Sequence, residues 1–475
     1  MPGRRVRESP IAPLVAFSVF TNLGIAGRAF RVEEGIPEAT RTLLTGFGAR
    51  LDDAADFGFV VVDGSRVEMD VPAIIPAPPR TPAARLDWAR WWMPASRAAV
   101  AALGERVRGL RFGISMVLEP KTAVLALLLA EAGAVVDVFA FAAETDDATA
   151  AELASRGVAV HAAASATPDE ERLHALALLD RAPQLLVDDG AHVIRLAHAE
   201  RPDLVAGLIG ATEETTSGVT PLRAMAAAGA LRIPVVAAND AVTKTWFDNR
   251  HGTGETCVLA IVRTLDDDLS GERAVVVGFG PVGEGVAERL RVLGARVTVV
   301  EIDPRRELAA RFAGYRTAPI AEAVRDADLV VSATGAPRTI DAPVLDACRE
   351  DAVIAVAGGA PEEVLSASGT RRERIAPHVE RLHLPSGRAV RLLAGGDCVN
   401  IVAGEGNPID VMDLSFAVQA ASIAMLLDAG LAPGVHVLPA EADRAVAGSA
   451  LGRSPGASAA PAPADWRRTR FDLEA

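Results

Sequence analysis

The chain has 475 residues, 50% of them hydrophobic, which is enough for two or three domains with substantial cores. Its formal net charge is -14 and it has no long Lys/Arg run, so nucleic acid and membranes are disfavoured as partners and a small molecule is favoured. Cys257, Cys348 and Cys398 lack CxxC spacing, so we expect no disulfide framework, no metal site and a reducing cytoplasmic setting. No apolar run has the length expected of a membrane span.

Residues 1–84 are expected to form an N-terminal accessory segment. The apolar stretch at residues 11–20 is predicted to be a buried strand and not a signal peptide, because no convincing small-residue cleavage site follows it. Residues 39–48 (ATRTLLTGFG) are typical of a helix, and residues 57–64 (FGFVVVDG) are typical of a strand. These patterns assign no role to the segment.

Residues 85–242 alternate strand, turn and helix, which predicts an α/β domain with a parallel sheet. A strand and turn begin at Arg111, a buried helix covers residues 121–134, and the next strand covers residues 135–141. The apolar run at residues 184–190 (QLLVDDG) ends in two aspartates at the carboxyl end of a strand. Ligands bind at that edge of a parallel sheet, so we expect a substrate domain here.

Residues 243–400 are predicted to form a second, Rossmann-like domain. Gly278, Gly280 and Gly283 form G-x-G-x-x-G between an apolar strand and a helix, and Glu301 ends the following strand. The glycines permit a tight turn and a close approach of the backbone to a pyrophosphate, and the carboxylate suits the ribose of NAD and repels the 2′-phosphate of NADP. Glycines alone could mark only a turn, but this context favours NAD binding.

Several long segments resemble the S-adenosylhomocysteine hydrolase family. They are EETTSGVTPLRAM, VAANDAVTKTWFDN, VVVGFGPVGEGVAERLRVLGARVTVVEIDP, LLVDDGAH, LLAGGDCVNI and GVHVLP. The resemblance implies a NAD domain inserted into the substrate domain, a return to the substrate domain at residues 401–450 and a homo-oligomer. Residues 451–475 are rich in Pro, Ala, Gly and Ser, a composition that predicts a flexible tail. The resemblance also implies a nucleoside substrate whose 3′-hydroxyl is oxidised and whose C4′ hydrogen is then removed. The 5′ substituent leaves by β-elimination, water adds to the product, and the 3′ position is finally reduced again.

The resemblance also assigns roles to individual residues. Lys244 and Asp248 match the pair that polarises and deprotonates the 3′-hydroxyl, where a desolvated lysine can act near neutral pH. Glu214 matches the residue that holds the 2′-hydroxyl, and Asp189 is expected to do acid-base work. Around the nicotinamide and its riboses the matching residues are Thr215, Thr216, Asn249, Glu301 and Asn400. Lys244 and Asp248 could instead form a structural ion pair, and the two aspartates could simply mark a turn.

The departures from the family gather on the substrate side. Val117 and Gly359 stand in place of histidines, and Asn407 replaces a histidine that contacts the base. Glu119 and Lys121 lie where purine-contacting residues are expected, with Thr215 nearby as a further substrate contact. His192 replaces the acidic residue beside the homocysteine amine, Thr253 replaces a cysteine, and the family's carboxyl-terminal Lys and Tyr have no counterpart.

These departures lead us to expect a nucleoside lyase or dehydratase that eliminates a 5′-side group such as water. Imidazole is the usual proton carrier near neutral pH, so its loss beside an intact oxidation motif indicates altered chemistry after oxidation. His192 and His251 are new candidate proton carriers, although each alone fits a structural histidine. The alternatives are a divergent adenosylhomocysteinase and an NAD-binding regulatory pseudoenzyme.

Overall fold

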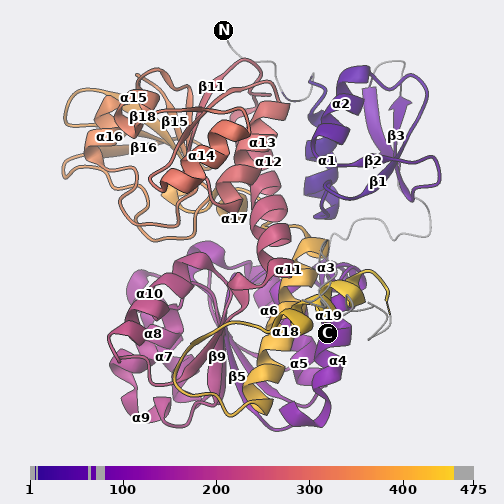
Figure 1. The fold of residues 1–475 in the computed structure, drawn as a ribbon, viewed down its shortest axis with the longest axis vertical. Coiled ribbons are helices and arrows are strands. Elements are labelled where there is room, and N and C mark those ends of the chain that lie inside the picture. The colour runs from indigo at the N-terminus through magenta and orange to yellow at the C-terminus, as the bar shows by residue number, and fades with distance from the viewer. Residues whose placement is uncertain (1–5, 7–8, 63–65, 71–80, 454–475) are drawn as a thin grey trace, which may run out of the picture.

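The structure, a computed structural model, describes residues 6, 9–62, 66–70 and 81–453. The flexible tail predicted at residues 451–475 lies outside this part from residue 454 onward. Two large α/β lobes are stacked along the long axis, and a small N-terminal lobe lies beside the upper one (Figure 1). Helix α12 (Gly254–Leu265) lies in the upper lobe on the side that faces the N-terminal lobe, and its N-terminal end points to the waist where the two large lobes meet.

The N-terminal lobe is built on a sheet with strand order β2-β1-β3-β4. The prediction of a strand at residues 11–20 is wrong, because this stretch forms helix α1. Pro13 occupies its first turn, and its buried residues Leu14, Phe17 and Thr21 recur at helical spacing, which the apolar composition alone could not distinguish from a strand. The elements of the lobe are α1 (Ala12–Thr21), β1 (Ala29–Val32), α2 (Glu38–Gly46), β2 (Arg50–Leu51), β3 (Phe57–Val62) and β4 (Arg66–Asp70).

The loop between α1 and β1 fastens this lobe to the waist. The Glu255 carboxylate, at the start of α12, accepts the backbone N–H groups of Ile25 at 2.8 Å and Ala26 at 3.1 Å. Asp410 accepts the N–H of Gly24 at 2.9 Å and pairs with Arg28 at 2.6 Å. The N-terminal lobe is therefore held by two carboxylates that belong to the rest of the molecule.

The lower lobe contains a parallel sheet with strand order β19-β10-β9-β8-β5-β6-β7. Its central strands β5, β8 and β9 are short and almost wholly buried, as expected of a sheet covered by helices on both faces. Its elements up to the waist are α3 (Pro82–Trp91), α4 (Pro94–Leu103), β5 (Arg111–Ser115), α5 (Pro120–Glu131), β6 (Val135–Phe139), η3 (Ala142–Glu144), α6 (Asp147–Ser155), β7 (Ala159–His161), α7 (Pro168–Asp180), β8 (Leu185–Asp188), α8 (His192–Glu200), α9 (Pro202–Val205), β9 (Gly210–Glu213), α10 (Thr216–Ala227) and β10 (Pro234–Ala237).

The upper lobe contains the third sheet, with strand order β13-β12-β11-β14-β15-β18-β17-β16. Strand β11 is followed by the glycine turn and then by α13, as the fingerprint predicts. Its elements are β11 (Arg273–Val277), α13 (Pro281–Val292), β12 (Arg296–Val300), α14 (Pro304–Phe312), β13 (Arg316–Thr317), α15 (Ile320–Ala323), β14 (Leu329–Ser332), α16 (Ala342–Ala347), β15 (Val353–Val356), β16 (Arg371–Ala376), β17 (Val379–His383) and β18 (Ala389–Leu393).

The chain then returns to the lower lobe through α17 (Val399–Val402), α18 (Ile409–Asp428), β19 (Gly434–His436) and α19 (Ala440–Ala450). Strand β19 pairs in parallel with β10, so chain segments on both sides of the upper lobe share one sheet. Sequence analysis found no run of bilayer length, yet α18, with 20 residues and a mean hydropathy of 1.5, is long and apolar enough to span a membrane. Of its most apolar window, 67% is buried inside the protein, as in the core helix of a soluble fold.

Candidate active site

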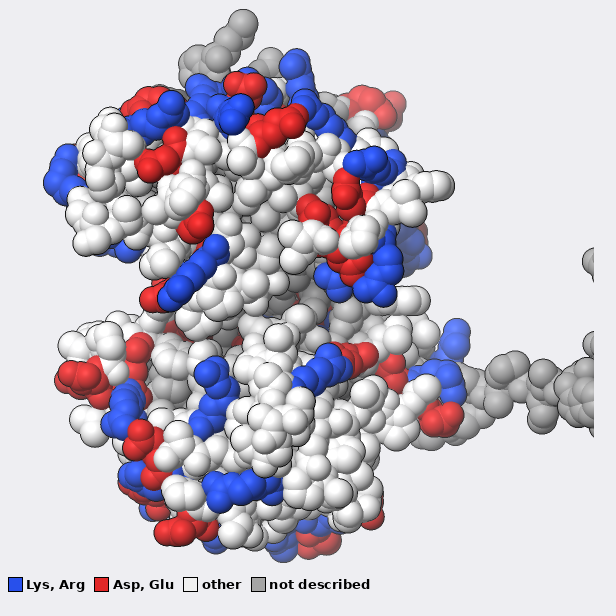
Figure 2. All heavy atoms as spheres, turned by 60° about the vertical axis from the view of Figure 1, so that its left-hand side comes forward, with Lys and Arg blue, Asp and Glu red and all other residues white. Residues whose placement is uncertain are grey.

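A cleft of ≈1140 Å³ lies between the two large lobes. It is lined by residues of both lobes, and Figure 2 shows a groove at the waist. Most of the residues selected from the sequence line it, namely Glu119, Asp189, His192, Glu214, Thr215, Thr216, Lys244, Asp248, Asn249, Gly278, Gly280, Glu301, Asn400 and Asn407. Lys121 and Gly283 do not reach its surface.

Lys244 lies at the centre of a buried polar group. Its Nζ is 2.5 Å from the Asp248 carboxylate and 3.5 Å from the Glu214 carboxylate, and it donates a hydrogen bond to Asn249 Oδ1 at 2.7 Å. Lys244 ends α11 (Val242–Lys244), and the π-helix η5 (Thr245–Thr253) follows directly. Residues 244, 248 and 249 thus share one face of a widened helical turn, a feature found often at functional sites.

The carboxylates around Lys244 keep its side chain charged. Burial lowers the pKa of Lys244, but the charges of Asp248 and Glu214 outweigh burial and raise it above its ordinary value. This direction favours a charged Lys244 over the neutral lysine base expected from the sequence. Burial raises the pKa of Glu214 to about 7, and Ser415 and Gln419 both donate hydrogen bonds to its carboxylate.

Asp189 projects into the cleft from the end of β8. Asp188 accepts the backbone N–H of Ile194 at 2.8 Å, and Glu213 accepts those of Gly190 at 2.9 Å and Ala191 at 2.8 Å. These two buried carboxylates fix the turn, which leaves Asp189 free to face the cleft. Burial raises the pKa of Asp189 to about 6, although the charge of Lys244 opposes the shift.

The glycine turn has the backbone shape that a dinucleotide requires. Gly278 has φ of +94°, and a Cβ atom on Gly283 would lie 1.9 Å from the carbonyl oxygen of Gly278. The Glu301 carboxylate accepts the N–H of Phe279 at 2.7 Å and that of Ile302 at 2.7 Å, which places it beside the turn. A turn without side chains before the N-terminus of α13 fits the pyrophosphate of NAD, and the carboxylate next to it fits the ribose.

Asn249 and the two threonines lie where the lobes meet. Asn249 Nδ2 donates to Asn239 Oδ1 at 3.2 Å, and Thr216 Oγ1 donates to the same oxygen at 3.2 Å. Thr215 Oγ1 caps α10 by accepting the N–H of Gly218 at 3.3 Å. All three residues line the cleft, as do the glycine turn and Asp189, and their role beside the nicotinamide stays a prediction.

Asn407 was predicted to contact the substrate, but its amide is fully engaged with protein groups. Its Oδ1 accepts Asn400 Nδ2 at 2.7 Å, and its Nδ2 donates to Thr253 Oγ1 at 3.0 Å and also to the Asp248 carboxylate. Asn407 therefore links two residues selected from the sequence, Asn400 and Asp248. Its position in the structure favours a role in orienting Asp248.

Lys121, which was predicted to contact the substrate, does not line the cleft in this structure. Its side chain is 0% exposed. Its Nζ forms an ion pair with the Glu119 carboxylate and donates a hydrogen bond to the backbone oxygen of Glu405 at 2.9 Å. Glu119, whose side chain is 15% exposed, lines the cleft in front of it. Glu119 can meet a base directly, and Lys121 holds its carboxylate in place.

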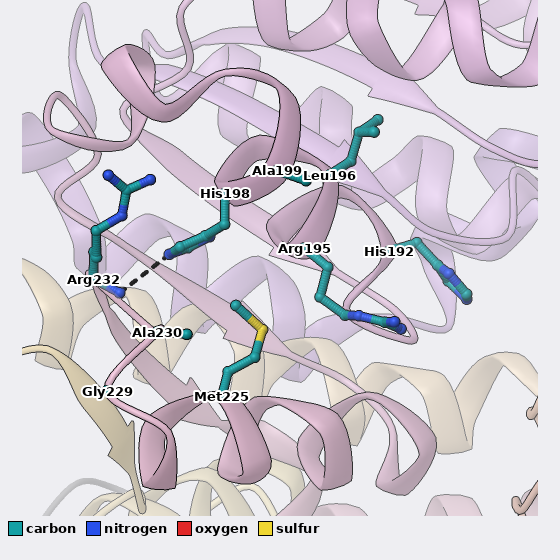
Figure 3. A pocket seen from close by; sticks show the side chains of 9 residues that line it. All are labelled: His192, Arg195, Leu196, His198, Ala199, Met225, Gly229, Ala230 and Arg232. Atoms are coloured by element: carbon teal, nitrogen blue, oxygen red, sulfur yellow. Dashed lines mark hydrogen bonds between the residues drawn. The ribbon is translucent and has the colours of Figure 1, made fainter.

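His192 lies at the edge of the cleft, at the start of α8. Its ring packs edge-on against Phe141, with ring centroids 5.0 Å apart. It also borders a second pocket, of ≈780 Å³, together with Arg195 and Met225 (Figure 3). Burial and the charge of Arg195 lower the pKa of His192, so the imidazole is neutral at neutral pH. His251 contacts Arg289 at 2.8 Å and does not line the cleft.

Sequence reasoning missed Glu144, which lines the cleft next to these groups. It follows β6 at the same sheet edge as Asp189, which follows β8. The rule that ligands bind at the carboxyl ends of parallel strands could have identified it.

The NAD-binding domain of S-adenosyl-L-homocysteine hydrolases matches residues 249–406 of this chain. Over 372 residues the chain is 38% identical to S-inosyl-L-homocysteine hydrolase of Methanopyrus kandleri, covering 76% of this chain and 88% of that protein. The chain belongs to the S-adenosyl-L-homocysteine hydrolase family. Adenosylhomocysteinase of Thermotoga maritima is 36% identical over 372 residues, covering 76% of this chain and 92% of that protein.

The phosphoglycerate oxidoreductase of Vibrio cholerae o395 has a TM-score of 0.36 and 16% identity, over 55% of this chain and 78% of that chain, which is too weak to support any argument. As a member of the S-adenosyl-L-homocysteine hydrolase family the protein is an NAD-dependent enzyme of the adenosylhomocysteinase type, with the Rossmann-like domain that the fingerprint predicts.

Proposed function

We propose that the protein is a nucleoside lyase that oxidises its substrate transiently at the 3′ position and eliminates a 5′-side group such as water. One observation carries the proposal: the buried group of Lys244, Asp248 and Asn249 is complete, whereas Val117 and Gly359 line the same cleft where the family has histidines. The residues for oxidation are thus present, and the residues for the later proton transfers differ.

NAD, when bound at the glycine turn and Glu301, supplies the reversible oxidation at the 3′ carbon. The ammonium of Lys244 binds and polarises the 3′-oxygen, and the Asp248 carboxylate beside it accepts the hydroxyl proton. Glu214 forms a hydrogen bond to the 2′-hydroxyl, which fixes the ribose against Lys244. Oxidation acidifies the hydrogen on C4′, and Asp189, which is ionised above about pH 6, removes it.

Hydrolysis of S-adenosylhomocysteine or S-inosylhomocysteine is the second candidate, because relatives with 36–38% identity carry those names. The neutral His192 beside Arg195 disfavours it, because an ammonium group there would have no ion-pair partner. A regulatory pseudoenzyme is disfavoured by the complete group around Lys244, since burying these charges without a catalytic use would be costly.

Mass spectrometry of the NAD-loaded protein after incubation with nucleosides and with S-adenosylhomocysteine separates these functions. We expect a nucleoside product lighter by one water or lacking another 5′ substituent. Rapid release of homocysteine would favour hydrolysis instead, and unchanged substrates together with no formation of NADH would favour the pseudoenzyme.

A further inference from the structure

The position of Glu144 places an acidic side chain beside the site of a missing histidine. Glu144 ends the short helix η3, after β6. Its backbone oxygen accepts the N–H of Leu118 at 2.9 Å, and the oxygen of Leu118 accepts the N–H of Asp146 at 2.9 Å. Leu118 directly follows Val117, so the segment of Glu144 runs along the segment in which the family has an imidazole.

Three other acidic groups of the cleft are already engaged, whereas Asp397, which also lines the cleft, follows β18 of the upper lobe. Glu119 pairs with Lys121, Asp240 pairs with Arg223, and Glu171 accepts the N–H of Ala142 at 2.6 Å. Within the described ranges, the carboxyl group of Glu144 forms no hydrogen bond or ion pair. Glu144 therefore presents an unengaged carboxyl group to the cleft, next to the loop that carries Val117.

We propose that Glu144 is the acid that protonates the departing 5′ group, in place of the missing imidazole. This inference rests on the proposed elimination. In that step Asp189 takes the proton from C4′, the C4′–H electron pair forms the C4′=C5′ double bond, and the C5′–O bond breaks with its electron pair on oxygen. The oxygen takes the proton of Glu144 and leaves as water, so Asp189 ends protonated and Glu144 ends ionised.

The electrostatics of the cleft give the carboxyl groups of Asp189 and Glu144 different pKa values. Burial and the neighbouring carboxylates of Asp189, Asp397 and Glu171 raise the pKa of Glu144 to about 8, and Cys398 lines the same cleft. The pKa of Asp189 is raised only to about 6. Between these values Asp189 is ionised and can act as a base, while Glu144 is protonated and can act as an acid.

A hydroxyl leaving group makes such an acid necessary. Hydroxide is the conjugate base of water, whose pKa is about 15.7, whereas a thiolate derives from a thiol with a pKa of about 8.5. An unassisted hydroxide is therefore a far poorer leaving group than a thiolate. A chloride leaving group needs no proton at all, which provides a direct test.

The test compares Glu144→Gln with the wild type, both loaded with NAD, on adenosine, inosine and their 5′-chloro-5′-deoxy analogues. NADH formation is followed by absorbance, exchange of the C4′ hydrogen by mass spectrometry in D₂O, and elimination by product analysis. We expect E144Q to form NADH and exchange C4′ hydrogen normally. Its elimination should fall by about 10²–10⁴-fold with a hydroxyl leaving group and by less than about threefold with chloride.

Equal elimination rates in E144Q and the wild type, or equal losses with both leaving groups, would overturn the role of Glu144. Absence of NADH and of C4′ exchange in the wild type with every probe would instead refute the proposed function, and this inference with it. His192→Gln tests the rival donor, and a loss confined to hydroxyl substrates in that variant would assign the proton to His192.

Glu144→Asp provides a second variant that keeps the acid but shortens its reach. We expect it to recover part of the elimination with hydroxyl substrates, whereas no recovery over E144Q would argue against proton donation. The wild-type elimination rate should fall as pH rises through about 8, and this fall should be absent with chloride. Asp397→Asn should move the fall to lower pH, because it removes one charge that raises the pKa of Glu144.

Discussion

Replacing Lys244 with Met should remove the only positive charge that the described structure places within ion-pair distance of Asp248 and Glu214. Its Nζ is 2.5 Å from Asp248, and its side chain is 3% exposed, so solvent cannot replace it. Removing one partner of a buried ion pair costs about 3–5 kcal/mol, because the other partner stays buried and unpaired. At about 1.4 kcal/mol per pKa unit, this loss corresponds to a total rise in pKa of roughly two to four units, shared among the carboxyl groups around Lys244.

The pKa values of these carboxyl groups determine whether the stability of the variant rises or falls with pH. Asp189 and Glu214 already have folded-state pKa values of about 6 and about 7, above those of an unfolded chain, and losing Lys244 raises them further. The folded variant then binds more protons than the unfolded chain, so its free energy of unfolding falls as pH rises from about 5 to about 8. The wild type should lose less stability over the same range.

Urea unfolding at both ends of this pH range measures the stability loss, and equilibrium dialysis with NAD measures cofactor binding. K244M should bind NAD nearly as well as the wild type but form no NADH with a nucleoside that the wild type oxidises. Lys121→Met is the matched control, because it removes another buried lysine and should destabilise the protein while still permitting NADH formation. NADH formation by K244M at the wild-type rate, or a stability loss independent of pH, would refute the reasoning.

Three further predictions concern single side chains. The protein should bind NAD more tightly than NADP, because a 2′-phosphate would meet the Glu301 carboxylate; equal affinities in dialysis would contradict this role. Release of homocysteine from S-adenosylhomocysteine should be slow, and His192→Asp should tighten binding of that compound by about tenfold, measured by calorimetry; unchanged affinity would remove His192 from the 5′ side of the cleft. Asp189→Asn should form NADH but exchange C4′ hydrogen slowly, so that NADH accumulates; if NADH formation were blocked as in K244M, Asp189 would act earlier than proposed.

The sequence was sufficient where a motif requires one backbone shape. Gly278 and Gly283 could be placed because strand, turn and helix leave no room for a side chain, and Lys244 and Asp248 are one helical turn apart in any helix. It was insufficient where tertiary contacts decide the role of a side chain. Nothing local shows that Lys121 turns away from the cleft toward Glu119 and the Glu405 backbone.

Glu144 and the first helix show two further limits. The pKa of Glu144 depends on its burial and on the carboxylates of Asp189 and Asp397, which are 45 or more residues away and reach Glu144 only when the two large lobes are folded around the cleft. The stretch at residues 12–21 has no alternating polar face, because exposed residues such as Val19 and Phe20 are apolar too, so periodicity does not distinguish helix from strand there. The boundaries predicted for the domains and the roles predicted for the site residues stay predictions.

The hydrogen bonds from the first lobe to Glu255 and Asp410 bear on how the molecule unfolds. Burial raises the pKa of Glu255 to about 7, and the backbone N–H groups of Ile25 and Ala26 act against that rise. Detaching the first lobe would leave this carboxylate buried at the start of α12 without those donors, in a helix that packs against α13 of the upper lobe. The lobes should therefore lose structure together in one cooperative transition, and cleaving the chain within residues 71–80 should lower the melting temperature of the cofactor-binding lobe as well.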